Sequence, residues 1–170
     1  MTLAAASLLI FAGLLCVAAL TDLTSYTIPN WISGALLLAF PLAALAAGMP
    51  WQLAAQHAAV GGAALVIGMG LFALGWLGGG DAKLFSATAL WLGLPAAGHY
   101  LMWVAFTGAG LTIALIVARQ MWAIAPAPAA PAWVRTLFAP KGDVPYGLAL
   151  AAGGLLALPH SPLFAAALTA

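Results

Sequence analysis

The sequence predicts an all-α, polytopic membrane protein with six transmembrane helices in a single domain, residues 1–170. Of the 170 residues, 66% are hydrophobic and 4% are charged, whereas a soluble domain carries about 25% charged residues. The hydrophobic residues form six segments separated by polar, glycine- or proline-containing stretches. An α-helix needs about 20 apolar residues to cross a bilayer. This composition excludes a soluble globular domain, and a net charge of +1 provides no nucleic-acid-binding surface.

The first three predicted helices are residues 3–20, 31–47 and 53–77. The first contains 18 residues, about 27 Å of helix, which is close to the ~30 Å thickness of a hydrocarbon core. No Lys or Arg precedes it, so we interpret it as a permanent helix rather than a signal peptide. Pro29 is well placed to start the second helix, and a Gly-Met-Pro sequence ends it.

The last three predicted helices are residues 82–95 (or 82–97), 100–118 and 146–168. The fourth is short. The sixth is expected to be interrupted near Leu158 and Pro159, because proline removes a backbone hydrogen bond from a helix. The long loop before it contains repeated prolines, which favour an extended conformation.

Charged residues predict the orientation of these helices. All of them follow the first, third or fifth segment: Asp22, Asp81, Lys83, Arg119, Arg135, Lys141 and Asp143. With six spans, these loops share one side of the membrane, whereas merging the fourth and fifth spans would scatter the basic residues. Since basic loops remain inside, that side is predicted to be cytoplasmic, with both termini outside.

Two aspartates are the candidate catalytic residues. Asp22 falls just past the predicted end of the first helix, and Asp81 follows three glycines at the start of the fourth. The predicted topology places both at one membrane face and at similar depth. Two neighbouring carboxyls share one proton, so one can activate water as a base while the other polarises a peptide carbonyl. This is aspartic protease chemistry, and it needs no metal.

Each aspartate also has a structural interpretation. Asp22 could mark the polar end of the first helix, and Asp81 could be the N-cap of the fourth. The glycines would then form a tight turn, whereas in a protease they would let an extended substrate approach closely. Membrane carboxyls also serve proton pathways, so a small proton-coupled transporter or channel component is an alternative function. Against transport, no predicted span carries an ionisable residue at mid-membrane.

Three motifs follow one another along the chain. They are Asp22 with Ile28-Pro29-Asn30, then Gly78-x-Gly80-Asp81 with Lys83, then Pro145-Tyr146-Gly147. In this ordered combination, and in segment number and loop placement, the sequence resembles the type IV prepilin peptidases, which are GxGD intramembrane aspartyl proteases. It looks most like the short form associated with Flp-type (tight adherence) pili. The resemblance covers essentially the whole chain.

The resemblance implies a function and a set of site residues. Asp22 and Asp81 would be the catalytic pair, and Gly78 and Gly80 would shape the active-site turn. The protein would sit in the bacterial inner membrane and remove a short basic leader at the cytoplasmic face, just before the hydrophobic helix of a pilin precursor. Its partner would be an Flp-type prepilin. An inactive pilus-assembly protein that only binds pilin is the second alternative.

The sequence departs from the family pattern in one respect. Longer members carry a cytoplasmic region with two CxxC pairs and also N-methylate the mature pilin. This chain starts directly with its first hydrophobic segment and has one cysteine, Cys16, in an apolar stretch. We therefore expect no methyltransferase activity, no bound metal and no cofactor.

Four more residues are candidates for contacts with the site or substrate: Lys83, Pro145, Tyr146 and Gly147. We expect Lys83 mainly to reach the membrane interface, because residues two apart on a helix do not face each other. An electrostatic effect on Asp81 is the alternative role of this lysine. Tyr146 could donate a hydrogen bond near the site, or serve only as an interfacial aromatic residue.

The remaining polar residues have structural interpretations. Asp143 is expected to cap the sixth helix, with Pro145 in its first turn, although it could instead attract a basic leader. His57, His99 and His160 fall on the outer side or in the outer halves of spans. We interpret them as interfacial polar residues, since their spacing does not indicate a metal site.

Overall fold

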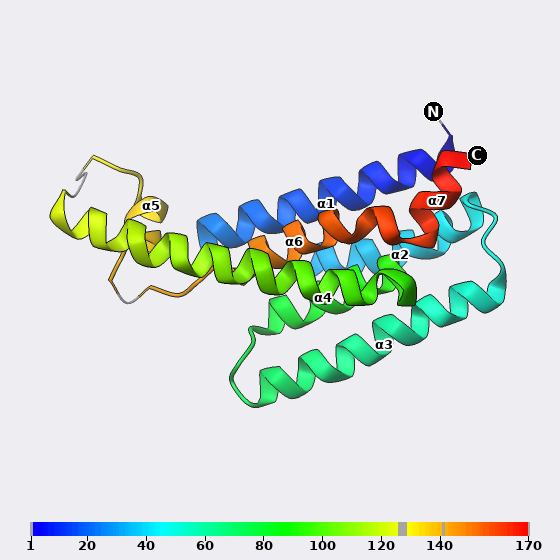
Figure 1. Cartoon of the computed structure of the whole chain (residues 1–170), viewed down its shortest axis with the longest axis horizontal. Helices are drawn as coiled ribbons and strands as arrows, with labels where there is room; N and C mark the ends of the chain where they lie inside the picture. The colour runs from blue at the N-terminus through cyan, green and yellow to red at the C-terminus, as the bar shows by residue number, and fades with distance from the viewer. Residues whose placement is uncertain (1, 126–128, 141, 170) are drawn as a thin grey trace.

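The computed structural model describes residues 2–125, 129–140 and 142–169. These residues contain helices and no β-strand, which confirms the predicted all-α class. Along the chain (Figure 1) the elements are α1 (Leu3–Ser25), α2 (Asn30–Ala46), α3 (Trp51–Ala73), α4 (Gly79–Ile124), α5 (Ala132–Leu137), α6 (Tyr146–Ala157), the 3₁₀ helix η1 (Leu158–His160) and α7 (Pro162–Thr169). Lys141, one of the basic residues used to predict orientation, lies outside the described residues.

The long helix α4 turns back on itself at Gly93 (Figure 1). Gly93 has a φ of 70° and a ψ of −179°, a conformation that only glycine adopts readily. In a continuous helix, Phe85 and Tyr100 would lie about 22 Å apart along the axis. Their rings instead stack with centroids 5.5 Å apart. Two limbs, residues 79–92 and 94–124, therefore correspond to the predicted fourth and fifth segments.

Three described helices are long and apolar enough to cross a membrane, namely α1, α3 and α4. A fourth crossing is available if α6 and α7, which are bent by 56° at the η1 segment, act as one span. This bend confirms the predicted interruption of the last segment. Helix α2 is also apolar but is shorter, with 17 residues or about 26 Å of helix. The number of six spans and the sides of the loops remain predictions.

The core is built around Trp91 on the first limb of α4. Its indole is fully buried, stacks on Phe11 of α1 at 5.0 Å and meets the edge of Phe40 of α2 at 6.1 Å. Its Nε1 donates a 2.8 Å hydrogen bond to the carbonyl of Leu36. Because a buried indole needs such a partner, Trp91 fixes α1 and α2 against α4.

His57 is buried rather than interfacial, so the prediction for this residue was wrong. Its side chain has no exposed surface, its Nδ1 lies 2.8 Å from the carbonyl oxygen of Leu90, and its ring stacks on Phe40. A Cβ added to Gly93 would overlap the imidazole. The turn at Gly93 encloses the histidine, and a linear pattern of hydrophobic residues does not reveal such a turn.

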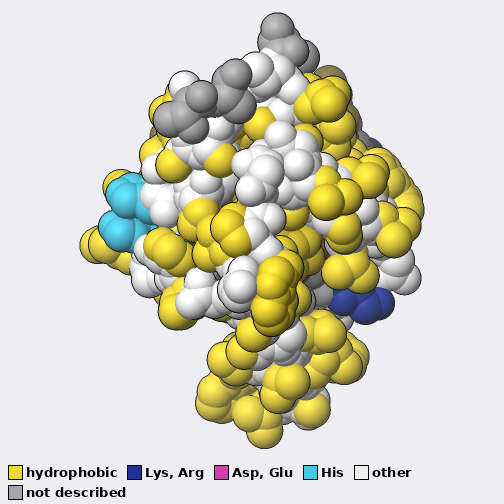
Figure 2. Space-filling view, turned by 90° about the vertical axis from the view of Figure 1, so that its right-hand side faces the viewer, with side chains coloured by type: hydrophobic (Ala, Val, Ile, Leu, Met, Phe, Trp, Pro, Cys, Tyr) yellow, Lys and Arg dark blue, Asp and Glu magenta, His cyan; other side chains and the backbone are white. Residues whose placement is uncertain are grey.

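The two ends of the molecule differ in character. Both termini lie at one end, where α1 contacts α7 (Figure 1). His99 and His160 stack on each other with centroids 3.7 Å apart. The face in Figure 2 is mostly hydrophobic and uncharged, with histidine side chains at its left, a Lys or Arg patch at its right, and no acidic side chain in view. The C-terminal end of α1 and the start of α4, which carry Asp22 and Asp81, lie away from the termini.

Candidate active site

Asp22 lies inside α1, one turn before its end. The prediction placed it just past the helix, but α1 continues to Ser25. Tyr26 then adopts a left-handed conformation (φ 53°), and its N–H donates to the carbonyl of Asp22 at 2.8 Å. This is a common way to end a helix. The carboxylate is buried, and its Oδ2 accepts a 2.7 Å hydrogen bond from the backbone N–H of Gly147 in α6.

Asp81 lies in the first turn of α4, and it is not the N-cap. The helix begins at Gly79, with Gly78 as the N-cap residue, so the alternative interpretation of Asp81 as the N-cap was wrong. The carboxylate reaches back to interact with the backbone N–H of Gly78, as the third residue of a helix often does. Its Oδ1 is buried and has no hydrogen-bond partner among the described residues. The interaction with Gly78 therefore holds the carboxylate in place, and Oδ1 remains available for another hydrogen bond.

Asp22 and Asp81 line one cavity of about 220 Å³. Tyr26, Thr27, Ile28, Asn30 and the glycines at positions 78–80 complete its lining. The two carboxylates are close enough for the charge of one to act on the other. The end of α1, the loop before α2 and the start of α4 therefore meet at one polar site.

Three glycines bring the backbone close to this cavity. A Cβ on Gly78 would lie 2.7 Å from Oδ2 of Asp81, and one on Gly147 would lie 2.8 Å from Oδ2 of Asp22. A Cβ on Gly80 would lie 3.2 Å from the Cβ of Ile28. The space at Gly80 is thus taken by the protein's own Ile28. The other two glycines each allow a carboxylate to approach the backbone.

The remaining predicted candidates lie around the cavity rather than in it. Lys83 is exposed, and its Nζ donates a 2.8 Å hydrogen bond to Oδ1 of Asn30, which lines the cavity. Pro145 is buried and precedes α6 as its N-cap residue. Tyr146 is 44% exposed, lies near Gly108 and does not line the cavity. Asp143 does not cap α6, since no side chain provides that cap.

Two residues near the site were missed by the sequence analysis. Tyr26 lines the cavity, and burial raises the pKa of its phenol above the usual value while nearby Arg119 partly opposes the rise. The phenol therefore stays protonated near neutral pH. Arg119 donates hydrogen bonds to the carbonyls of Leu137 (3.0 Å) and Asp143 (2.7 Å). Tyr26 lies between Asp22 and Ile28 of the first motif, and this position is the only feature of the sequence that indicates it. Nothing local in the sequence marked Arg119.

Metal ligands do not gather at this site or elsewhere in residues 2–125, 129–140 and 142–169. No group of three or more His, Cys, Asp or Glu side chains in these ranges is arranged to hold an ion. The described residues that line the cavity supply two carboxylates, the phenol of Tyr26, the hydroxyl of Thr27, the amide of Asn30 and backbone N–H groups.

Comparison with known proteins identifies the family of the chain. A model of the type IV leader peptidase family matches residues 9–118, which is more than half of the sequence. The matched range contains both cavity aspartates and ends before Gly147. No curated protein and no solved structure matches the chain. With two acids at one cavity and a match of this extent, the chain belongs to the type IV leader peptidase family, and it is a protease that acts on a protein substrate.

Proposed function

We propose that the protein is an intramembrane aspartic endopeptidase that removes the leader from prepilin-like precursors of the Flp type. The observation that carries this proposal is the shared cavity: Asp22 and Asp81, from helices far apart in the sequence, line the same small polar space. Acidic side chains in a membrane protein are costly to keep, and two that meet usually serve a function. The family membership supports a leader peptidase activity at this pair.

The environments of the two carboxyls favour different roles. We assign the base to Asp22, because the N–H of Gly147 donates to its carboxylate and stabilises negative charge there. We assign the proton donor to Asp81, whose Oδ1 is buried without a described partner. Asp22 would take a proton from water while the oxygen attacks the peptide carbonyl carbon, and Asp81 would donate to the carbonyl oxygen. The C–N bond then breaks as Asp22 gives the proton it took from water to the leaving nitrogen and Asp81 takes a proton back from a hydroxyl of the tetrahedral intermediate. The products are a carboxyl terminus and an amine terminus, and both aspartates return to their starting states.

The cavity is proposed to face the cytoplasm of the bacterial inner membrane. The described basic residues lie near the ends of helices rather than in loops: Lys83 in the second turn of α4, Arg119 in its last two turns and Arg135 in the short α5. Arg119 also acts electrostatically on Tyr26, which lines the cavity. Basic loops are retained on the cytoplasmic side during insertion. The proposal is limited to hydrolysis, because the sequence has one cysteine and no CxxC pair.

The proposed catalytic pair can be tested by replacing each of the three aspartates of the chain in turn. The protein is co-expressed with an Flp-type prepilin, and leader removal is followed by the size of the pilin and by its N-terminal sequence. We expect D22N and D81N each to slow cleavage by at least about 10³-fold, as loss of one member of a catalytic unit does. D143N is the matched control, since Asp143 is exposed and does not line the cavity.

The amount of each variant in the membrane fraction is measured alongside cleavage. Normal processing by D22N or D81N at wild-type protein levels would show that the carboxyl pair is not catalytic. Proton movement into vesicles by a protein that cuts no precursor would instead support the transporter alternative.

A further inference from the structure

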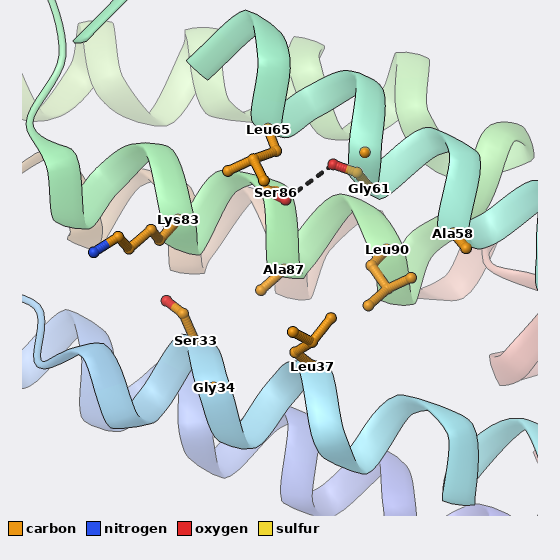
Figure 3. A pocket seen from close by; sticks show the side chains of 11 residues that line it. Ser33, Gly34, Leu37, Ala58, Gly61, Leu65, Lys83, Ser86, Ala87 and Leu90 are labelled. Atoms are coloured by element: carbon orange, nitrogen blue, oxygen red, sulfur yellow. Dashed lines mark hydrogen bonds between the residues drawn. The ribbon is translucent and has the colours of Figure 1, made fainter. Parts of the chain in front are cut away.

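A lipid-accessible groove runs along the helix that carries Asp81. It lies between α2 and α3, with the first limb of α4 as its floor, and has a volume of about 360 Å³ (Figure 3). Side chains from all three helices line it, among them Ser33, Leu37, Gly61, Leu65, Lys83 and Leu90. Helices α2 and α3 each pack on α4, whereas they have little contact with each other, which leaves the groove open.

The groove follows the helix axes and opens sideways. From Lys83 to Leu90 the floor covers seven residues, about 10 Å of helix. Leu37 and Leu65, on its two walls, are 59% and 40% exposed. Figure 3 shows Leu37 and Leu90 directed into the space between α2 and α4. Its length and shape fit the ridge of side chains on about two turns of another helix.

One end of the groove adjoins the carboxylate cavity. Lys83 lines the groove, and its Nζ donates a 2.8 Å hydrogen bond to Asn30. Asn30 in turn lines the cavity together with Asp22 and Asp81. The Lys83–Asn30 pair therefore forms the junction between the two spaces. A helix lying in the groove would bring the residues that precede it to the carboxylates.

The groove surface suits a helix better than a lipid chain. Gly34 and Gly62 face open space, since a Cβ on either would meet nothing within 4 Å. The hydroxyl of Ser33 is buried and lacks a hydrogen-bond partner among the described residues. Helices in membranes pack through small residues and through hydroxyl hydrogen bonds, whereas an acyl chain has no group to pair with Ser33.

We propose that this groove binds the membrane helix of the protein substrate, with the N-terminal end of that helix at the Lys83–Asn30 junction. The inference rests on the proposed function, since it takes the substrate to be a precursor whose cleavage site precedes an apolar helix. The cavity would then act on the peptide bond, while the groove selects the helix that follows. A short leader peptide without its helix would use the cavity alone.

Substitutions that fill the groove test whether the groove binds the substrate helix while the cavity acts on the peptide bond. A Cβ at position 34 or 62 meets no other atom within 4 Å, so Gly34→Leu and Gly62→Leu add bulk to the groove, and Gly13→Leu is the control on an exposed, open face of α1. We expect both groove variants to raise KM for the intact precursor at least fivefold, as loss of one helix–helix contact would. Cleavage of a peptide that ends at the start of the helix should be unchanged. Wild-type kinetics on the precursor, or equal losses on both substrates, would overturn the proposal.

Cross-linking gives a readout that does not depend on cleavage. A photoreactive phenylalanine analogue replaces Leu37, which lines the groove, or the neighbouring Leu38, which is 75% exposed and faces elsewhere. Both are placed in the Asp81→Asn protein in membranes containing the precursor. We expect capture of the precursor from position 37 and not from position 38. Capture of lipid alone, or of a second copy of the enzyme, would overturn the proposal. If position 37 captures the precursor but the wild-type enzyme does not cleave it, the proposed peptidase function, rather than the groove, is wrong.

Discussion

The backbone N–H of Gly147 donates a 2.7 Å hydrogen bond to Oδ2 of Asp22, joining two residues 125 positions apart. Gly147 lies in the first turn of α6, and Asp22 lies in the last turn of α1. A backbone donor holds a carboxylate more rigidly than a flexible side chain, because its position is fixed by the helix. The start of α6 therefore orients one of the two acids at the cavity.

Substitution of Gly147 by alanine should disrupt this arrangement. A Cβ there would lie 2.8 Å from both Oδ2 of Asp22 and Cδ1 of Ile28, so at least one of them must move. We expect cleavage to fall at least about tenfold, with a loss of about 1–3 kcal/mol in stability, as overpacking typically causes. Precursor cleavage and thermal unfolding in detergent measure the two effects. Gly110→Ala, at an open position, is the control, and full activity of Gly147→Ala would contradict the positioning role.

The turn at Gly93 makes a separate prediction about folding. Gly93→Ala would force a side chain into a conformation with φ 70° and into the imidazole of His57. Backbone strain alone costs about 1–3 kcal/mol, so we expect a clear fall in melting temperature. Gly98→Ala, where a Cβ meets nothing, should melt like the wild type. If both variants melt alike, the tight packing at this turn is not required for the fold.

Arg119 is expected to hold the segment after α4 in place. Its guanidinium donates to the carbonyls of Leu137 and Asp143, and Arg119→Gln removes the charged donors. Loss of such bonds should raise amide exchange in α5 by about three- to tenfold. Hydrogen–deuterium exchange of residues 132–138 measures this change. Arg135→Gln, at an exposed arginine, should leave exchange outside its own position unaltered.

Lys83 is expected to contribute little to the chemistry itself. Its ammonium is bonded to Asn30, and it is solvent-exposed. Lys83→Met should reduce kcat for a short leader peptide by no more than about threefold, because exposed polar contacts contribute less than about 1 kcal/mol. Steady-state kinetics of Lys83→Met and Lys83→Arg test this. A large loss of kcat restored by arginine would instead indicate that a positive charge beside Asp81 is needed.

The features that the sequence predicts well are those set by local composition. The apolar segments, the break near Leu158 and the pairing of Asp22 with Asp81 at one end of the bundle depend on hydropathy, proline and loop alternation. The end of the first helix was misjudged, because a polar Thr-Asp sequence suggested an end that α1 passes through. Its actual end depends on the left-handed Tyr26, which hydropathy does not reveal.

The features that the sequence does not predict depend on contacts between segments that are far apart along the chain. The donor to Asp22 comes from Gly147, the enclosure of His57 comes from the turn at Gly93, and Arg119 bonds to backbone carbonyls. Every residue has a backbone carbonyl and every residue except proline has an N–H group, so no residue pattern marks which of them will be used. Only the packed helices decide these partners.

The first limb of α4 also has a consequence for the surrounding lipid. Residues 79–92 form about 21 Å of helix, whereas a hydrocarbon core is about 30 Å thick. Such a mismatch is relieved by thinning the bilayer or by drawing one end of the helix below the headgroups. The acyl-chain length of the membrane would then set how readily water reaches Asp81, so the same enzyme should cut faster in vesicles of short-chain lipids than in thick ones.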